Sequence, residues 1–448
     1  MNVRISLKSN TELEHKLEAK TVTVGVIGLG YVGLPLVHVF WQAGIKVIGF
    51  DIDPAKIIKL DRGESYISHF AHERIVKMND SGRFRATGDF SDLGTCDAIL
   101  ICVPTPITAT REPDLSFVVD TAEVIARHLR KETLVVLEST TYPGTTQEVV
   151  LPILEKSGLS AGNDFYLAFS PEREDPGSVI ETKAIPKIVG GTDPYSGELA
   201  ARLYSLGFSQ IHKVSDAQTA EAVKITENIF RAVNIALVNE LKLAYSNMGI
   251  NIWDVIEAAK TKPFGYMAFY PGPGLGGHCI PIDPFYLSWR ARAFEVETKF
   301  IELAGEINRA MPRIVVQTLI NALSERQAKA IKNAKILVLG VAYKKNVDDT
   351  RESPALHIIH MLRELGAEVD YYDPYVPEIP RTREYAHLAS LKRISFEEST
   401  IAQYNAALIV TDHDNVDYNA LVRWSRLVVD TRNATRNAKE DGHKIVRA

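Results

Sequence analysis

Cysteine is scarce in this chain of 448 residues, which contains only Cys96, Cys102 and Cys279. Three scattered cysteines are too few for a disulfide framework or a zinc site, so we expect a reducing, cytoplasmic environment and no bound metal. An excess of basic residues is also missing. The net charge of -5 gives no indication of nucleic acid or an anionic membrane as a partner.

A secretory signal is missing as well, because residues 1–20 are polar and predict a loose arm or a short helix. The segment 21–45 contains no Asp, Glu, Lys or Arg, and its length is that of a membrane span. Its glycines and its β-branched beginning favour a strand, a tight turn and a buried helix instead. The chain is long enough for roughly three domains.

The first strand and turn have the pattern of a dinucleotide site. Residues 22–27 predict a buried strand, residues 28–33 read G-L-G-Y-V-G, and a second strand at 46–50 ends at Asp51. Such glycines let a pyrophosphate approach a helix N-terminus, and the carboxylate binds the adenosine ribose and repels a 2′-phosphate. A tight turn without a ligand is the alternative. We predict a Rossmann domain that binds NAD through Gly28, Gly30, Tyr31, Val32, Gly33 and Asp51.

Further strands are predicted to end at polar residues. Strands at 98–103 and 134–137 lead to Thr105 and Thr140, which we expect to meet the nicotinamide half of the cofactor. Cys102 is interpreted as a core residue inside its strand. After a strand at 166–169, the charged run that begins with Glu172 and Arg173 predicts either a solvated turn or the lining of a polar pocket.

A long, largely apolar helix is predicted from Asp216, as its N-cap, to about residue 247. Lys224, Asn228 and Arg231 share one face of it. A solvated stripe is the usual explanation of such spacing. Because a helix that is apolar around most of its circumference is usually buried, we favour a role in acid–base chemistry. The helix also suits a dimer interface.

Residues 269–284 read F-Y-P-G-P-G-L-G-G-H-C-I-P-I-D-P. Glycines at this density suit a loop that must approach a ligand closely. Cys279 follows a histidine and precedes Asp283, which is the company of a reactive thiol. A surface loop with an inert buried cysteine is the alternative.

The strand–helix pattern restarts in the last third. A long helix is predicted after Pro312, strands at 335–340, 367–372, 406–411 and 427–430, and a helix at 353–365. The G-x-G-x-x-G turn is replaced by segment 343–354, named the basic turn for Lys344, Lys345 and Arg351, which it holds beside three acidic residues. Arg432 follows the last predicted strand. These features suit a phosphate-bearing ligand other than a dinucleotide, with a charged surface turn as the alternative.

Seven motifs, in this order, resemble the UDP-glucose/UDP-N-acetylmannosamine 6-dehydrogenase family from about residue 21 onward: G-L-G-Y-V-G-L-P, V-P-T-P, E-S-T-T-Y-P-G-T-T, S-P-E-R, K-I-T-E-N-I-F-R-A-V-N-I-A-L-V-N-E, G-G-H-C-I-P-I-D-P and A-Y-K-K-N-V-D-D-T-R-E-S-P. The resemblance implies an α/β fold, a homodimer or higher oligomer, and NAD-dependent oxidation of the C6 alcohol of a UDP-sugar to a carboxylate. The implied parts are an arm at 1–20, an NAD-binding Rossmann domain at 21–213, a central helical domain at 214–314 and a UDP-sugar-binding domain at 315–448.

The resemblance also implies residue roles. Cys279 would capture the C6 aldehyde as a thiohemiacetal, which is oxidised to a thioester and hydrolysed. Lys224 and Asn228 would stabilise the oxyanion. Asp283 would assist near the thiol, and Thr140 and Glu172 would surround the water and the reacting carbon. The implied substrate contacts are Glu172, Arg173, Lys224, Asn228, Arg231, Gly276, His278, Tyr343, Lys344 and Arg432, and Arg351 is implied near cofactor and substrate.

The identity of the sugar depends on fewer residues. Glucose-type members tend to have an apolar residue in place of Arg231 and G-G-Y-C in place of G-G-H-C. The runs R-E-P-D-L-S-F at 111–117 and K-P-F-G at 262–265 look like the bacterial UDP-N-acetylglucosamine 6-dehydrogenases of O-antigen synthesis. We therefore expect UDP-N-acetylglucosamine, ahead of UDP-N-acetylmannosamine, UDP-N-acetylgalactosamine and UDP-glucose.

Two other classes share part of this pattern. A two-electron β-hydroxyacid dehydrogenase can have the Rossmann domain and the Lys/Asn helix, but it would need neither Cys279 nor a third domain. A nucleotide-sugar sensor with a silent site is disfavoured because Cys279, Lys224, Asn228 and Asp283 occur together.

Overall fold

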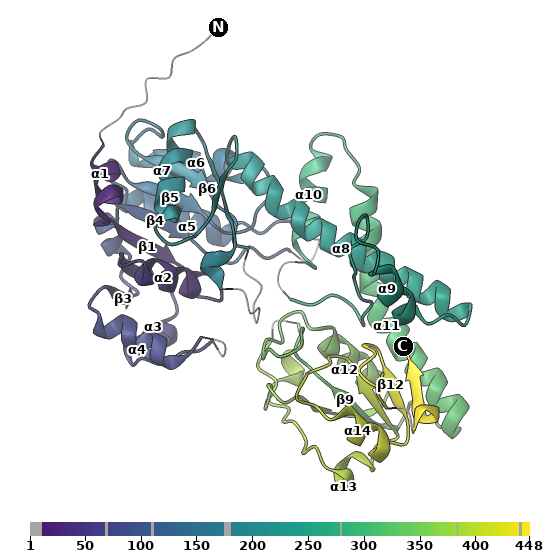
Figure 1. The fold of residues 1–448 in the computed structure, drawn as a ribbon. Helices are drawn as coiled ribbons and strands as arrows, with labels where there is room; N and C mark the ends of the chain where they lie inside the picture. Colours follow the sequence, from purple (N-terminus) through teal and green to yellow (C-terminus); the bar gives the residue numbers. More distant parts are fainter. Residues whose placement is uncertain are drawn as a thin grey trace. The chain divides into compact units, whose positions relative to one another are not determined.

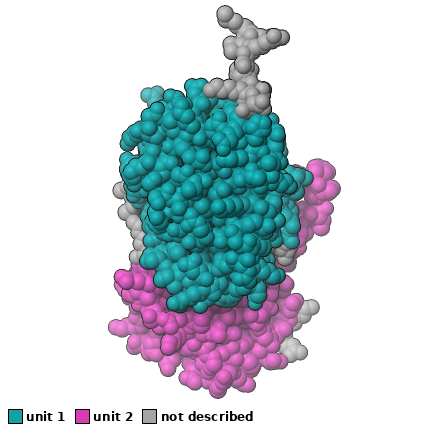
Figure 2. Space-filling model, turned by 90° about the vertical axis from the view of Figure 1, so that its left-hand side faces the viewer, with its two compact units in different colours: residues 1–227, 285–296 teal, residues 228–284, 297–448 magenta. Residues whose placement is uncertain are grey.

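The computed structural model describes residues 11–67, 70–108, 112–173, 181–277, 280–382, 384–438 and 441–448. The chain forms two compact units, which Figure 2 distinguishes by colour. Unit 1 comprises residues 1–227 and 285–296, and unit 2 comprises residues 228–284 and 297–448.

Unit 1 is built on an eight-stranded sheet with the order β3-β2-β1-β4-β5-β6-β7-β8 (Figure 1). All neighbours are parallel except β6 and β7, which are antiparallel. The order reverses between β1 and β4, and such switch points are where open α/β sheets bind ligands. The strands are β1 (Thr23–Ile27), β2 (Lys46–Phe50), β3 (Phe84–Thr87), β4 (Ala98–Ile101), β5 (Leu134–Leu137), β6 (Tyr166–Phe169), β7 (Lys187–Gly191) and β8 (Ile211–Lys213).

Alternating strand residues divide the core of unit 1 into two layers. Val24 and Val26 pack in one layer, and Ile27 packs in the other. The first layer is covered by α1 (Glu12–Ala19), α2 (Gly33–Gln42), α3 (Pro54–Asp61), α4 (His72–Asp80) and α7 (Pro194–Ser205). The second is covered by α5 (Ser116–His128), α6 (Leu151–Leu154) and the start of α8 (Ala217–Asn247).

The uncharged segment 21–45 is a strand, a turn and a buried helix, as its glycines predict. No helix in the described part of the chain has the length and apolar composition to span a bilayer. The polar start contains the short helix α1, which Thr11 caps by accepting a hydrogen bond from Glu14 N.

Unit 2 contains a five-stranded parallel sheet with the order β10-β9-β11-β12-β13. Helices α11 (Lys299–Gln327) and α12 (Pro354–Glu364) cover one face, and α13 (Glu398–Ile401) and α14 (Tyr418–Trp424) cover the other. Strand β13 has no counterpart among the predicted strands. The strands are β9 (Lys335–Leu339), β10 (Glu368–Tyr372), β11 (Ala406–Ile409), β12 (Val428–Asp430) and β13 (Ile445–Arg447).

The long helix α8 confirms the prediction for residues 217 to about 247, and Asp216 caps it by accepting a hydrogen bond from Thr219 N at 2.7 Å. Two shorter helices follow, α9 (Ile252–Ala259) and α10 (Asp283–Arg292). The prediction that a helix begins after Pro312 was wrong, because α11 begins at Lys299 and contains this proline. A proline inside a helix costs about 3 kcal/mol. The buried neighbours of Pro312, such as Met311 and Val315, offset that cost.

Two glycines of the first turn make a matched pair for a stability test. A Cβ on Gly33 would lie 1.9 Å from the Gly28 carbonyl oxygen, whereas a Cβ on Gly30 would meet no described atom within 4 Å. We expect Gly33→Ala to lower the free energy of unfolding by about 2 kcal/mol or more, because backbone must move. Gly30→Ala should change it by less than about 1 kcal/mol. Chemical denaturation compares them, and equal losses would contradict this explanation of the turn.

Candidate functional site

The glycine turn of unit 1 lies where β1, β2 and β4 end together. Gly28 has a φ of +92°, and a Cβ on it would lie 2.6 Å from the Cys102 carbonyl oxygen. Its N–H donates to the Phe50 carbonyl at 2.8 Å. Cys102 follows β4 directly and does not lie inside it, which corrects the predicted strand end. The turn therefore brings backbone close to the N-terminus of α2, and the space beside Gly30 suits a pyrophosphate.

Asp51 lies next to this turn and is 5 % exposed. Its Oδ2 accepts hydrogen bonds from Leu29 N at 2.9 Å and from Lys56 Nζ at 2.8 Å. Its Oδ1 accepts from Asp53 N at 2.9 Å. The predicted ribose acceptor is thus also the anchor of the turn. Tyr31 and Val32 are half-buried in the same turn.

The two threonines predicted to meet the nicotinamide half are brought together. The Thr105 hydroxyl donates to the Thr140 carbonyl at 2.7 Å. The Tyr286 hydroxyl, on α10, donates to the Thr105 carbonyl and to the Pro106 carbonyl. The ends of β4 and β5 are therefore tied to one another, and Thr105 is tied to α10 within unit 1.

The charged run that follows β6 is held in place by Arg173. Arg173 forms an ion pair with Glu227, with Nη2 2.6 Å from Oε1, and it donates to the Pro186 carbonyl at 2.7 Å. Glu172 is only 14 % exposed in its side chain, and its Oε1 accepts from Arg173 N at 2.7 Å. Of the two predicted arrangements, the burial of Glu172 favours the lining of a polar pocket. The remaining charged residues of the run, Glu174 and Asp175, lie outside the described residues.

Helix α8 buries the first two members of its predicted polar face. Lys224 is 8 % exposed and Asn228 is 7 % exposed, whereas Arg231 is exposed. Within unit 2, Asn228 Nδ2 donates to Asp283 Oδ2 at 2.6 Å, and Asp283 is 3 % exposed. The structure thus joins two predicted catalytic residues that are 55 positions apart.

The glycine-rich loop packs on the basic turn of unit 2. A Cβ on Gly276 would lie 2.8 Å from the Tyr343 Cβ. Gly277 has a φ of +82°, and its N–H donates to the Arg351 carbonyl at 3.2 Å. Both positions therefore require glycine. His278 and Cys279, on which the nucleophile prediction depends, lie outside the described residues.

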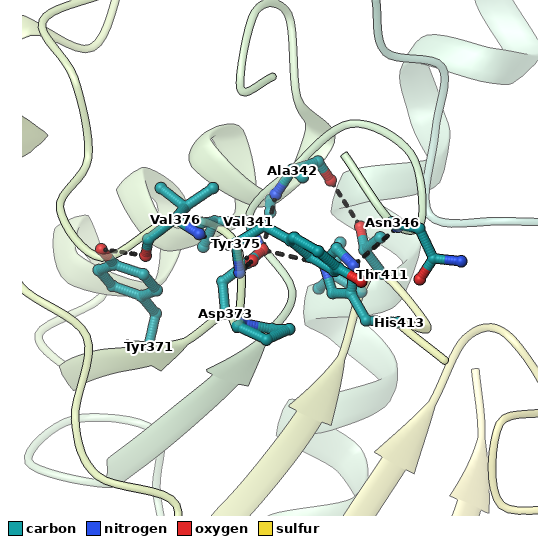
Figure 3. Close-up of polar contacts among 12 residues, drawn as sticks. Val341, Ala342, Asn346, Tyr371, Asp373, Tyr375, Val376, Thr411 and His413 are labelled. Carbon is teal, nitrogen blue, oxygen red and sulfur yellow. Dashed lines mark hydrogen bonds and ion pairs between the residues drawn. The ribbon is translucent and has the colours of Figure 1, made fainter. Parts of the chain in front are cut away.

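The basic turn itself is fixed by a buried carboxylate (Figure 3). Asp373 follows β10, and its Oδ2 accepts from Val341 N at 2.7 Å and Ala342 N at 3.1 Å. The His413 Nε2 lies 3.0 Å from the same oxygen, and the His413 Nδ1 accepts from Asn346 N at 2.9 Å. Burial opposes ionisation, but these donors outweigh it and lower the pKa of Asp373.

Three basic residues of unit 2 were predicted to contact the ligands. Lys344 is half-buried, and Arg351 forms an ion pair with Asp349, with Nη2 2.6 Å from Oδ2. Arg432 donates from Nε to the Val410 carbonyl at 3.0 Å. A Cβ on Gly272 would lie 2.4 Å from Arg432 Nη1, so this glycine too makes room for a predicted substrate contact.

Sequence reasoning missed two buried charged residues on α8. Glu221 is fully buried, accepts from Gly144 N at 2.5 Å and from Thr146 N at 2.8 Å, and has a pKa that burial raises to about 7. Lys242 is 8 % exposed, and its Nζ has no hydrogen-bond partner among the described residues. A signal was present, because Lys242 lies 18 residues after Lys224, which is five helical turns on the same face.

Comparisons with known proteins agree with this arrangement. Residues 22–206 match the NAD binding domain of the UDP-glucose/GDP-mannose dehydrogenase family, residues 218–310 its central domain and residues 337–437 its UDP binding domain. The chain belongs to this family, as its motifs predicted. It is therefore an NAD-dependent UDP-sugar 6-dehydrogenase. The cradle at Gly28 and the carboxylate of Asp51 fit the NAD that the family uses.

The relatives extend over nearly all of the chain. It is 37% identical to the UDP-N-acetyl-D-glucosamine 6-dehydrogenase of Pseudomonas aeruginosa, over 82% of this chain and 86% of that protein. It is 35% identical to the UDP-N-acetyl-D-mannosamine dehydrogenase of Pyrococcus horikoshii, over 92% and 95%. A solved structure of the UDP-D-ManNAc dehydrogenase from P. horikoshii has a TM-score of 0.83 at 34% identity, and the match covers 92% of this chain and 96% of that one.

The ammonium of Lys242, which has no hydrogen-bond partner in the described part of the chain, should destabilise the ligand-free fold. Burial, with Arg432 nearby, lowers the pKa of Lys242 from 10.5 to about 8. The unfolded chain keeps the higher pKa, so the cost is full below pH 8 and fades as the pH rises toward 10.5. We expect Lys242→Met to raise the free energy of unfolding at pH 7 by on the order of 1–3 kcal/mol, and by much less near pH 10.

Urea denaturation at the two pH values measures this gain. Lys299→Met is the control, because the Lys299 side chain is 83% exposed and its removal should change stability by less than about 0.5 kcal/mol. A loss of stability in Lys242→Met at pH 7 would show that the ammonium is satisfied in solution.

Proposed function

We propose that the enzyme oxidises the C6 alcohol of UDP-N-acetylglucosamine to the carboxylate in two hydride transfers, through thiohemiacetal and thioester intermediates on Cys279. The observation that carries this proposal is the buried pair of Asn228 and Asp283, with Nδ2 and Oδ2 2.6 Å apart. Asp283 lies four residues after Cys279 and begins α10, so the pair fixes one end of the segment that holds the thiol.

The chemistry of α8 supports an oxyanion site. The Asn228 amide has two N–H groups, and one of them is used by Asp283, which leaves the second for a developing oxyanion. Lys224 lies one turn earlier on the helix and is equally buried. A lysine in such a place can take a proton from an alcohol as the neutral amine, and the ammonium that results can then stabilise negative charge on the oxygen.

Each oxidation step needs a hydride acceptor, which NAD supplies when it is bound. The thiol's part is to retain the aldehyde between the two steps, because a thiohemiacetal keeps the carbon attached to the enzyme. In the last step water attacks the thioester carbon, the carbon–sulfur bond breaks, and the thiolate leaves. Glu172 and Thr140 are the groups that we assign to this water.

The choice of an N-acetylhexosamine is supported by Arg231 and by the relatives. Arg231 follows Asn228 by three residues on α8, it is exposed, and its guanidinium can donate to an acetamido carbonyl. The two relatives described above are named for the N-acetylglucosamine and the N-acetylmannosamine substrates. UDP-N-acetylmannosamine is therefore the second candidate, followed by UDP-N-acetylgalactosamine and UDP-glucose.

The decisive experiment counts NADH per molecule of UDP-N-acetylglucosamine consumed and determines the product mass. We expect two NADH and the uronic acid. One NADH with an aldehyde or ketone product would contradict the thioester route. A larger kcat/KM for UDP-glucose than for UDP-N-acetylglucosamine would overturn the assignment of the sugar and leave the mechanism intact.

The thiol is tested by Cys279→Ala, which should reduce turnover by at least about 10³-fold, as removal of a nucleophile does. Cys96→Ala is the matched control, because Cys96 is buried in the core of unit 1 and should keep turnover within about threefold. Full turnover by the Cys279 variant would favour a two-electron dehydrogenase.

A further inference from the structure

A buried lysine lies behind Glu172 in unit 1. Lys187 is the first residue of β7, and its side chain is 3% exposed. Its Nζ lies 2.5 Å from Glu138 Oε2 and 3.8 Å from Glu172 Oε2. The sequence analysis predicted no strand at residues 187–191 and did not single out this lysine.

The strand register explains why Lys187 faces Glu172. Strands β6 and β7 are antiparallel, with Phe169 opposite Gly190. Continuing that register by three residues sets position 187 opposite position 172. Side chains at opposed positions of an antiparallel pair lie close together. Glu172 itself lies in the loop after β6, and the Ser170 hydroxyl, which donates to the Ile188 carbonyl at 2.7 Å, keeps the start of this loop beside β7.

Glu138 shares the same ammonium. It follows β5, and its side chain is fully buried. Its Oε2 is bound by Lys187, and its Oε1 accepts from the Tyr204 hydroxyl. One ammonium thus serves two carboxylates. Burial alone would lower the pKa of Lys187, but the charges of Glu138 and Glu172 outweigh it and raise that pKa, so the lysine stays protonated.

Glu172 is oriented from two sides. Its Oε1 accepts a hydrogen bond from Arg173 N at 2.7 Å, and its Oε2 faces Lys187. Lys187 also donates to the Pro171 carbonyl at 3.2 Å, next to Glu172 in the chain. Of the three N–H groups of the ammonium, two are engaged by Glu138 and Pro171, and the third is available to Glu172.

We propose that Lys187 is the positioning residue of Glu172: its ammonium orients this carboxylate and keeps it ionised as the proton acceptor for the water that hydrolyses the thioester. In this step the oxygen of water bonds to the thioester carbon, the thiolate leaves, and the proton of water passes to the Glu172 carboxylate. Glu138 determines how much of the lysine's charge acts on Glu172. The inference rests on the proposed function of Glu172.

Removing the charge of Lys187 and removing the charge of Glu138 should move the acid limb of the kcat–pH profile in opposite directions. In Lys187→Met, Glu172 loses its counter-charge and is protonated more easily, so the limb should move up by about one pH unit. In Glu138→Gln, the whole charge of Lys187 acts on Glu172, so the limb should move down. Lys187→Arg keeps the charge and should restore a profile close to that of the unmodified enzyme.

The step itself is visible on the protein. In Lys187→Met the hydride transfers should survive while hydrolysis slows by about 10- to 100-fold, so mass spectrometry should detect the accumulated thioester. Arg130→Met is the control. It removes the pair of Arg130 Nη2 and Asp97 Oδ1 at 2.8 Å, elsewhere in unit 1, and should leave the pH profile unchanged.

Lys187→Met leaves Glu138 buried without its counter-ion, which destabilises the fold. A second variant that removes both charges therefore serves as a test that does not depend on this destabilised protein. The double variant Glu138→Gln with Lys187→Met has no buried charge at the pair, and its acid limb should also lie above that of the unmodified enzyme. A folded double variant with an unchanged limb and no accumulated thioester would overturn the role of Lys187. Normal turnover by Glu172→Gln would instead remove the proposed function of Glu172.

Discussion

In each unit, a carboxylate that follows the second strand of the sheet along the chain (β2 or β10) accepts hydrogen bonds from the turn after the first strand (β1 or β9). The remaining site geometry depends on this contact. Asp51 accepts from Leu29 N in unit 1, and Asp373 accepts from Val341 N and Ala342 N in unit 2. The two carboxylates are otherwise satisfied differently. Asp51 pairs with Lys56 beside an open glycine turn, whereas Asp373 pairs with the buried ring of His413 (Figure 3). The same carboxylate-to-backbone contact therefore fixes the glycine turn of unit 1 and, in unit 2, a turn that lacks the G-x-G-x-x-G pattern.

Helix α8 concentrates charged and amide groups that an ordinary core helix would avoid. Glu221, Lys224, Asn228 and Lys242 are all less than 10% exposed, and burial of such groups is expensive unless partners exist. Glu221 and Asn228 have protein partners, whereas the Lys242 ammonium has none among the described residues. A helix that is apolar elsewhere can carry this set because its hydrophobic contacts offset the desolvation of the polar groups.

Much of the fold could be predicted from the sequence because its signals are local. Short runs rich in Val, Ile and Leu marked β1 and β9, and Asp216 marked the start of α8. Local rules failed at Pro312, where tertiary packing outweighs the cost of a helical proline.

The site was predictable to a smaller extent. Family motifs identified Asn228 and Asp283, but their contact spans 55 positions, and only the folded chain displays it. The pair of Lys187 and Glu138, 49 positions apart, left no periodic signal because both residues lie at strand ends. Burial also separated the predicted face of α8 into buried Lys224 and exposed Arg231, which helical spacing alone does not distinguish.

The reversal of strand direction between β6 and β7 has a consequence for how this site tolerates insertions and deletions. In a wholly parallel sheet, the side chain opposite Glu172 would come from a loop, and its place would change with every gain or loss of a residue there. Because β7 runs antiparallel to β6, its first residue reaches the carboxyl edge of the sheet, where it pairs with Ile211 of β8. The connecting segment before it can then vary in length at little cost, whereas a slip of one residue inside β7 would turn Lys187 to the opposite face.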